Sequence, residues 1–575
     1  MKLAGAAALI LAMFAPAFAN ARELDRVFLF GSAPFAAPAA TAEFTPPPNA
    51  MPARSHVEGR LRLLPQGRQE HVRVFHDDYF YAGVMGAGVK HLPDFDFEFV
   101  QDGAALIPVR RGPQQGTQRH WEWVLEPGAI WNDPQDGEAD RVVLPFSLQE
   151  RNANCLHNGL LTFLLAADGK VSRVAYQIGS ETCMYLKADL WGTFGAEYVP
   201  QRLPNGEAVV AAHRREVAAR LPVKPIESLG VDHPGAAAAE FGNPAEVPPE
   251  DMTAFGFVID GTHYVGGCMT RFGPHPFCAE IDLPSYSLAK TLVAGFAAMR
   301  LEKLYPGVLA ARIGQYVPEC ARASWQGVTF ENALDMVTGN YSSPVDQVDE
   351  AELSLTKFFG TESHAARIKV SCRYFRHQSA PGTQWVYHTS DTYVLGTALQ
   401  AFVHEHMGAE RDVYQDVLVG PLWHALGLSP LPDTTRRTRD AAAQPFTAYG
   451  LTLLPDDVAR IGVFLTRDHG RLQGESFFDE PAFESAMQRT PENRGVVSVD
   501  ESFRYNNGLW AHDVSGYIGC SSPVWVPYMV GYGGITVLLL PNDTVYYYFS
   551  DGGVFSWSRA VAEANRIRTL CPSTK

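Results

Sequence analysis

Residues 284–295, PSYSLAKTLVAG, contain a serine and a lysine three positions apart at the start of an apolar stretch. The pattern predicts a helix over residues 287–299, on which Ser287 and Lys290 lie on one face, one turn apart. A serine hydroxyl is a poor nucleophile unless a neighbour takes its proton. A lysine can do so only when its surroundings lower its pKa from about 10.4 toward 7. Apolar neighbours on the helix can bury Lys290, so the stretch predicts a nucleophile beside its base.

The spacing S-x-x-K is a weak signal by itself, because it occurs again at Ser354 and Lys357. That copy follows Asp346, Asp349 and Glu350 in a stretch that looks exposed, where a lysine stays protonated and paired. We therefore interpret the second copy as a solvated segment without function. No G-x-S-x-G sequence occurs, which argues against an α/β-hydrolase.

Strands and helices are predicted on both sides of the Ser287 stretch. Apolar runs at residues 255–259 and 263–265 flank Asp260-Gly261, a two-residue hairpin signal. Late in the chain, residues 535–540 and 545–549 have the composition of buried strands. Further helices are predicted over residues 329–336, 392–404 and 556–570. This order predicts an α+β fold, with an antiparallel sheet backed by helices and an all-helical region.

The N-terminal half has a different character. Short alternating runs between Asp-Gly turns predict a β-rich accessory domain over residues 55–220, either a small sandwich or a barrel, with a helix at its end. Prolines and glycines punctuate residues 221–250, which we interpret as a linker to a second domain at 251–575. Residues 22–54 are rich in proline and alanine and predict an extended leader segment.

Residues 1–21 have the features of a secretory signal peptide. Lys2 is a short basic region, residues 3–14 are small and apolar, and two A-x-A patterns end at Ala19 and Ala21. After them, no apolar run approaches the roughly eighteen residues that a membrane-spanning helix needs. We therefore expect a periplasmic or secreted protein.

The eight cysteines are an even number, which fits pairing in an oxidising compartment. No cysteine has a zinc-site spacing with histidines, and the two histidines of residues 404–406 point apart on a helix. We therefore expect structural disulfides, no metal and no cofactor. Many connectivities are possible, and pairing of sequence neighbours gives Cys155–Cys183, Cys268–Cys278, Cys320–Cys372 and Cys520–Cys571.

The charge of the chain limits its partners. It has 47 Lys and Arg against 63 Asp and Glu, a formal charge of −16. Nucleic acid and anionic membrane surfaces would repel such a chain, so neither is expected as the main partner. The expected partner is a small-molecule or oligomeric substrate, and the sequence does not indicate an oligomeric state.

Three further segments accompany the Ser287 stretch in a fixed order. They are TFENALDMVTG at 329–339, WVYHTSDTYVLG at 385–396 and VGYGG at 530–534. Together with SYSLAKTLVAG, they resemble the motifs of the serine β-lactamase and penicillin-binding-protein superfamily. The nearest branch holds class C β-lactamases, β-lactamase-like carboxylesterases and 6-aminohexanoate-dimer hydrolases. The resemblance covers residues 250 to 575 and implies a β-lactamase/transpeptidase-like fold for that part.

The resemblance also implies catalytic roles. Ser287 would attack a carbonyl carbon and become acylated, while Lys290 and Tyr387 would act as general acid and base. Tyr387 would need a neighbouring cation to serve as a phenolate, and Lys290 is the candidate. The backbone N–H groups of Ser287 and Tyr532 would form the oxyanion hole.

The resemblance further implies residues that contact the substrate. Gly531 and Gly533 would allow the backbone to approach the substrate closely. Tyr286 would lie beside it, and Trp510 would line the acyl pocket or belong to the core.

Two departures from the family pattern affect the expected substrate. The segment 526–531 has no cation where enzymes of this superfamily usually grip a substrate carboxylate, and Thr389 replaces the asparagine of class C enzymes. We therefore expect hydrolysis of esters or uncharged amides. The alternatives are a D-Ala-D-Ala carboxypeptidase or β-lactamase, and a catalytically silent binding protein on the same scaffold.

Overall fold

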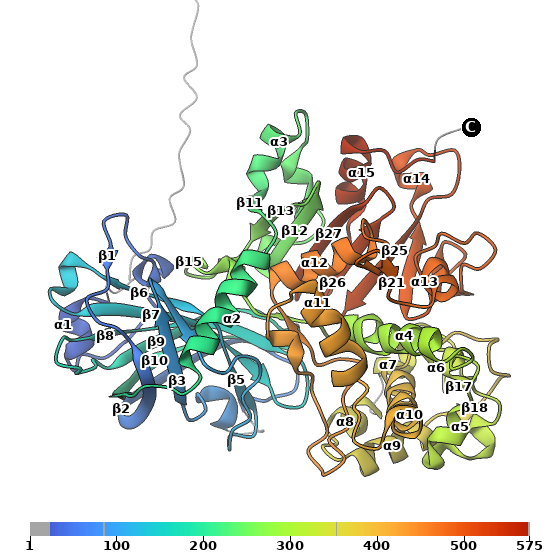
Figure 1. The fold of residues 1–575 in the computed structure, drawn as a ribbon, viewed down its shortest axis with the longest axis horizontal. Helices are drawn as coiled ribbons and strands as arrows, with labels where there is room; N and C mark the ends of the chain where they lie inside the picture. Colours follow the sequence, from blue (N-terminus) through green and yellow to red (C-terminus); the bar gives the residue numbers. More distant parts are fainter. Residues whose placement is uncertain (1–23, 84–86, 352–353, 573–575) are drawn as a thin grey trace, which may run out of the picture.

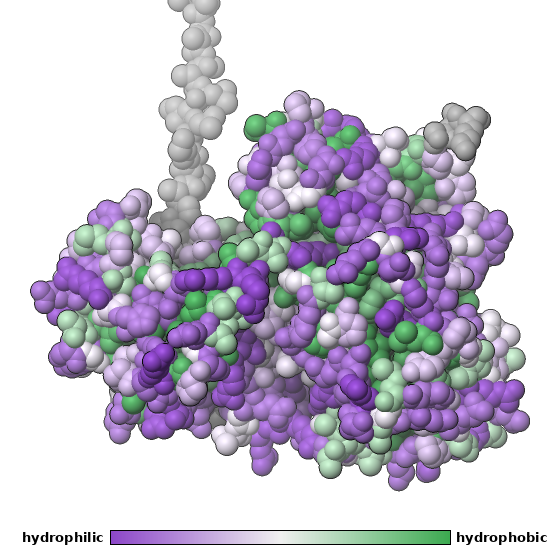
Figure 2. Space-filling view, in the orientation of Figure 1, coloured by the Kyte–Doolittle hydropathy of each residue, from purple (hydrophilic) through white to green (hydrophobic). Residues whose placement is uncertain are grey.

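The computed structural model describes residues 24–83, 87–351 and 354–572, which form two parts side by side (Figure 1). A β-barrel, coloured blue to cyan, stands beside a larger part in which a sheet is backed by helices. The fold is α+β, as predicted from the sequence. The face drawn in Figure 2 is mostly hydrophilic, with apolar side chains scattered among the polar ones. The predicted signal peptide lies outside the described residues.

Ten strands form the first sheet, in the order β1-β6-β4-β3-β2-β10-β9-β8-β7-β5. An additional pairing of β6 with β7 closes eight of these strands into a barrel. Apolar side chains such as Trp121, Trp123 and Phe95 fill its interior. The strands are β1 (Met51–Pro52), β2 (Glu58–Asp77), β3 (Asp96–Asp102), β4 (Ala105–Pro108), β5 (Trp121–Leu125), β6 (Gly128–Asn132), β7 (Asp140–Glu150), β8 (Leu156–Leu165), β9 (Val174–Thr182) and β10 (Leu186–Pro200).

The segment expected as an extended leader packs against the outside of the barrel. It contains α1 (Arg26–Phe30) and the 3₁₀ helix η1 (Thr41–Phe44). Phe28, Phe35 and Phe44 are buried there, in one cluster with Val143 of β7 and Leu164 of β8. Both faces of these strands are therefore covered, the inner face by the barrel core and the outer face by the leader.

A connecting segment leads from the barrel to the second part. It contains α2 (Gly206–Ala219), which agrees with the helix expected at the end of the N-terminal half, and then β11 (Val223–Pro225) and α3 (Leu229–Asp232). β11 lies within the expected linker, yet it pairs in parallel with β13 as an edge strand of the second sheet. The proposed domain division at residues 221–250 stays a prediction.

The second sheet has the order β11-β13-β12-β27-β26-β25-β24-β23-β22. Alternate residues of β26 and β27 face two different cores, so both faces are buried. The predicted hairpin is present, because Asp260 and Gly261 both have positive φ between β12 and β13. The remaining strands are β12 (Met252–Ile259), β13 (Thr262–Gly267), β22 (Val496–Val497), β23 (Phe503–Asn506), β24 (Leu509–Asp513), β25 (Trp525–Gly531), β26 (Ile535–Leu540) and β27 (Thr544–Ser550).

Helices cover both faces of this sheet and form a separate helical region beside it (Figure 1). α4 and α12 share the core on one face, and α15 shares the core on the other. The helices are α4 (Phe296–Leu304), α5 (Ile313–Tyr316), α6 (Phe330–Leu334), α7 (Val348–Ala351), α8 (Ser354–Phe359), α9 (His364–Arg373), α10 (Thr389–Met407), α11 (His424–Leu426), α12 (Pro455–Leu465), α13 (Glu480–Ala486), α14 (Ser515–Ile518) and α15 (Ser558–Ile567).

The eight cysteines pair as sequence neighbours, as expected. In the part of the chain that the structure describes, none of the helices combines the length and hydropathy that crossing a bilayer requires.

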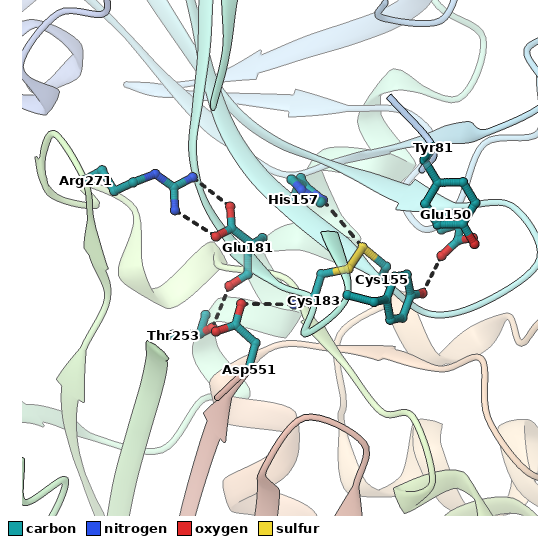
Figure 3. Close-up of a disulfide and its surroundings, with 10 residues drawn as sticks. Tyr81, Glu150, Cys155, His157, Glu181, Cys183, Thr253, Arg271 and Asp551 are labelled. Atoms are coloured by element: carbon teal, nitrogen blue, oxygen red, sulfur yellow. Dashed lines mark hydrogen bonds and ion pairs between the residues drawn. A yellow bond between two sulfur atoms is a disulfide. The ribbon is translucent and has the colours of Figure 1, made fainter. Parts of the chain in front are cut away.

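Polar contacts tie the barrel to the second part near the Cys155–Cys183 disulfide (Figure 3). Arg271 contacts both carboxylate oxygens of Glu181, each at 2.7 Å. Asp551, which follows β27, accepts a hydrogen bond from the Cys183 N–H at 3.3 Å. The barrel is therefore fixed against the end of a central strand of the second sheet.

Candidate active site

Ser287 lies in a turn between a short strand and a helix. The turn follows β16 (Leu283–Pro284), which pairs with β19 (Thr452–Leu453), and it leads into the π-helix η8 (Lys290–Gly295) and then α4. Tyr286 has φ of 39°, in the left-handed region that residues with a side chain seldom adopt. Ser287 is partly exposed, whereas residues 281–286 and 288–299 are buried. The turn thus presents one hydroxyl group from an otherwise buried run.

Lys290 is only 2% exposed and contacts the Ser287 hydroxyl directly. Its Nζ lies 2.8 Å from Ser287 Oγ, 3.0 Å from Thr389 Oγ1 and 3.4 Å from the Ala448 carbonyl oxygen. Burial lowers the pKa of Lys290 to about 8, although the Glu350 carboxylate opposes this change. The lowered pKa leaves a larger neutral fraction of Lys290 near neutral pH than an exposed lysine has. Lys290 is therefore able to accept the Ser287 proton near neutral pH.

Tyr387 joins these two residues from a distant part of the chain. It lies just before α10, hydrogen-bonds to Ser287, and has its ring centroid 4.9 Å from Lys290 Nζ. Burial raises the pKa of Tyr387 above its usual range, and the charge of Glu350 raises it further. The raised pKa of Tyr387 favours the neutral phenol near neutral pH, and a phenolate there would need a neighbouring cation such as Lys290.

Glu350 belongs to this site, although its acidic surroundings in the sequence suggested an exposed surface. It accepts hydrogen bonds from the Thr389 N–H, at 3.0 Å, and from the Thr389 hydroxyl. Thr389 Oγ1 also contacts Lys290 Nζ, so the Thr389 hydroxyl group links the Glu350 carboxylate to the Lys290 amine. No local sequence pattern pointed to this link, because α7 and α10 approach each other only in the folded chain.

His388 fixes the segment that carries Glu350. Its Nε2 lies 2.9 Å from Asp349 and its Nδ1 lies 3.5 Å from Asp391, while its ring stacks on Phe375. Burial disfavours the charged imidazole, yet the carboxylates of Asp391 and Asp349 raise the pKa of His388 to about 9. Because Asp349 precedes Glu350 in α7, this buried ion pair anchors Glu350 beside Thr389. No pattern in the sequence indicated this role for His388.

The glycine-rich segment passes close to the nucleophile turn. A methyl group on Gly531 would lie 2.8 Å from the Ser285 carbonyl oxygen and 3.3 Å from Tyr286 Cβ. Gly533 has φ of 94° in the turn between β25 and β26. Tyr532 lies between them, 46% exposed, with its ring centroid 5.8 Å from that of Tyr286. This segment and the Ser287 turn are therefore neighbours, as the predicted oxyanion hole requires.

Trp510 and Tyr286 also lie beside the predicted catalytic residues. Trp510, in β24, stacks on the Tyr387 ring with centroids 6.0 Å apart, and it is buried in an aromatic cluster with Trp385 and Tyr505. Tyr286 is buried next to Ser287. Trp510 thus packs against the ring of Tyr387, and Tyr286 packs between Ser287 and Tyr532.

Other motifs of the sequence lie away from this site. Lys357 of the second S-x-x-K sequence is exposed in α8, and residues 404–406 are exposed on α10. Within the described ranges, no group of histidine, cysteine and carboxylate side chains has the arrangement of a metal site. Two surface hollows of about 360 and 370 Å³ lie elsewhere, one beside Trp525 and one beside Arg376.

No family model and no curated protein matches this sequence. Among solved structures, the chain is similar to a provisional 6-aminohexanoate-dimer hydrolase from Bacillus anthracis, with 17% identity over 60% of this chain and 80% of the other, and a TM-score of 0.41. It is similar to a penicillin-binding protein homolog from Caulobacter crescentus, with 16% identity over 57% of this chain and 95% of the other, and a TM-score of 0.39. It is also similar to EstCE1, a hydrolase with promiscuous acyltransferase activity, with 14% identity over 63% of this chain and 100% of the other, and a TM-score of 0.41.

Proposed function

We propose that this protein is an exported serine hydrolase that cleaves carboxylic ester or amide bonds through an acyl-enzyme on Ser287. The observation that carries the proposal is the 2.8 Å contact between Ser287 Oγ and Lys290 Nζ, because burial lowers the pKa of that lysine to about 8. A partly exposed hydroxyl beside a buried amine of this kind suits nucleophilic catalysis. Four disulfides and the signal-like N-terminal sequence support export.

In the proposed acylation step, neutral Lys290 takes the hydroxyl proton while Ser287 Oγ bonds to the substrate carbonyl carbon. The bond to the leaving group then breaks, and Tyr387, a neutral phenol, donates its proton to that group. The Lys290 ammonium returns a proton to Tyr387. Water later attacks the acyl group and releases the acid, with the same two side chains moving protons in the opposite direction.

The negative oxygen that develops on the carbonyl group needs hydrogen-bond donors. We assign this role to the backbone N–H groups of Ser287 and Tyr532. Among the described residues, neither N–H donates to another protein atom, and Gly531 brings the two segments together. The helix that begins after Ser287 contributes its positive end.

The surroundings favour a substrate without a carboxylate beside the scissile bond. β25 has the sequence WVPYMVG and carries no cation. The aromatic rings of Trp385, Trp510 and Tyr505 lie near Tyr387, and the neighbouring Lys290 must be neutral to act as the base. A carboxylate there would lose its hydration without gaining a charged partner, whereas neutral acyl groups would not.

A substrate panel with mass detection tests this proposal. The wild-type protein would be mixed with p-nitrophenyl esters, a linear amide and nitrocefin, and trapped adducts would be mapped by peptide mass. We expect ester turnover with an acyl adduct on the peptide that contains Ser287, and weak hydrolysis of nitrocefin. Fast nitrocefin hydrolysis would favour the β-lactamase alternative. The absence of turnover and adduct across the panel would favour a silent binding protein.

Tyr387→Phe should slow substrates with poor leaving groups most. Loss of a general acid typically costs on the order of 10² to 10⁴ in rate, but p-nitrophenolate leaves without needing a proton. We therefore expect kcat/KM for an alkyl ester or amide to fall at least tenfold more than kcat/KM for the p-nitrophenyl ester. Tyr505→Phe is the control, since Tyr505 is buried in the same aromatic cluster. Equal losses on both substrates would contradict the assignment of Tyr387 as proton donor.

Glu350→Gln should move the pH profile toward acid. Activity requires neutral Lys290, so kcat/KM of the wild type is expected to rise with pH and level off above about 8, the pKa of Lys290. The Glu350 carboxylate raises that pKa, so its removal should lower the pKa and shift the rising limb to lower pH. The measurement is kcat/KM against pH, with Glu405→Gln at the exposed end of α10 as control. A shift to higher pH would show that Glu350 acts in another way.

A further inference from the structure

Asn154, in the connection between β7 and β8 of the barrel, reaches the turn that holds the nucleophile. Its Oδ1 accepts hydrogen bonds from the Tyr286 N–H at 2.8 Å and from the Gly450 N–H at 3.1 Å, and it lies 3.2 Å from Ser285 Oγ. Its Nδ2 donates to the Leu451 carbonyl oxygen at 3.3 Å. Asn154 is fully buried, so one side chain of the barrel satisfies several buried main-chain groups of the second part.

The first of these bonds supports an unfavourable backbone conformation. Tyr286 has φ of 39°, and a residue with a side chain stays in that region only when its surroundings hold it there. Asn154 binds the N–H of this residue, one position before the nucleophile. The position of Ser287 Oγ therefore depends on a contact from the barrel.

The other bonds hold the segment that contacts the base. The Ala448 carbonyl oxygen accepts from Lys290 Nζ, and Gly450 and Leu451, two and three residues later, bind Asn154. Asn154 thus fixes both the turn that carries the hydroxyl and the segment beside the amine. Among the described residues, no other amide side chain forms hydrogen bonds to both segments.

Asn154 is itself held firmly in the barrel. Cys155, the next residue, forms the disulfide with Cys183 (Figure 3). On the other side, the Arg436 guanidinium donates to the carbonyl oxygens of Glu150 and Arg151. A rigid support of this kind transmits its position to the groups that it binds.

We propose that Asn154 is a positioning residue for the nucleophile, and that the barrel is therefore a structural part of the active site. This inference rests on the proposed function, because it concerns the reactivity of Ser287. Without the Asn154 side chain, the Tyr286 and Gly450 N–H groups would lose their acceptor in a buried place. The Ser287 turn would relax away from the geometry that brings Ser287 Oγ to Lys290.

Asn158 provides a matched control for this proposal. It is also a buried asparagine of the barrel, and it also bonds to the main chain that leads to the nucleophile, at Asp282 N and O, both at 3.2 Å. Asp282 lies before β16, outside the Ser287 turn. Asn158→Ala therefore removes a similar pair of bonds between the two parts while leaving the Tyr286 N–H paired.

The test uses the full chain and a fluorophosphonate probe, in which Ser287 Oγ bonds to phosphorus and fluoride leaves while Lys290 takes the proton. The second-order labelling rate and the thermal midpoint would be measured for the wild type, Asn154→Ala, Asn158→Ala and Asn154→Asp. Small displacements of a catalytic group cost up to about 10²-fold, so we expect Asn154→Ala to label 10- to 100-fold more slowly than Asn158→Ala at a similar thermal midpoint. Asn154→Asp keeps the acceptor oxygen and should recover most of the rate.

The outcomes distinguish a failure of the proposed function from a failure of the positioning role of Asn154. Wild-type protein that takes no label on Ser287 would contradict the proposed function. Labelled wild type with equal rates for Asn154→Ala and Asn158→Ala would overturn the positioning role and leave the proposed function standing. If Asn154→Ala does not fold, the labelling rate of Asn154→Asp is the deciding measurement. A rate near that of the wild type supports the role of the acceptor oxygen. A rate 10-fold or more below that of Asn158→Ala contradicts it.

Discussion

Ser287→Ala is expected to remove the acyl adduct and to lower kcat/KM for p-nitrophenyl esters by at least about 10³-fold, because no other group can then form the covalent intermediate. Ser287 is partly exposed, so the substitution should leave the thermal midpoint nearly unchanged. Initial rates, intact mass and a thermal scan of the same preparations would check this result.

Ser354→Ala is the control, since it alters the second S-x-x-K sequence in α8. We expect this variant to retain wild-type turnover and adduct formation. Equal turnover by Ser287→Ala and the wild type would remove Ser287 as nucleophile. Loss of activity in Ser354→Ala alone would transfer the role to the other copy of the motif.

Lys290→Met is expected to have the second large effect, a loss of about 10³-fold in kcat/KM, with no loss of thermal stability. Methionine has a similar length but no basic nitrogen, so the Ser287 proton would have no acceptor within 2.8 Å. Burial lowers the pKa of Lys290, which means that the folded protein destabilises the ammonium form. An apolar side chain avoids this cost, so the thermal midpoint should stay equal or rise.

Lys357→Met, at the exposed lysine of α8, serves as the control and should keep full activity. Activity in Lys290→Met within tenfold of the wild type would exclude Lys290 as the base. A strong fall in its thermal midpoint would show that the ammonium group stabilises the fold, contrary to the pKa argument.

Local patterns predicted the elements around the nucleophile because each is determined by nearby residues. The Asp260-Gly261 hairpin follows from backbone conformations that few other pairs adopt, and residues 535–540 alternate between two apolar cores. The S-x-x-K spacing placed Ser287 and Lys290 together because it spans one helical turn. The motif around Tyr387 required the family resemblance, since its contact with Ser287 joins distant segments.

Local sequence patterns could not predict the long-range polar contacts of the site. Glu350 lies in an acidic stretch typical of solvated surface, but the contact of His388 with Asp349 holds the next residue, Glu350, beside Thr389. Asn154 has no motif of its own, and its partners are more than a hundred residues away along the chain. The protonation state of Tyr387 depends on burial and on Glu350, neither of which its sequence neighbours indicate.

The order of strands in the second sheet has a consequence for synthesis of the protein. β27 lies between β12 and β26. β12 is synthesised early, so it cannot pair with β27 until one of the last segments of the chain has left the ribosome. Contacts between such distant segments form late and slowly. The helix that follows the Ser287 turn packs on this sheet, so we expect the turn to adopt its final conformation only after these strands have formed. The proposed nucleophile is therefore expected to become reactive only after the last strands of the second sheet have been made.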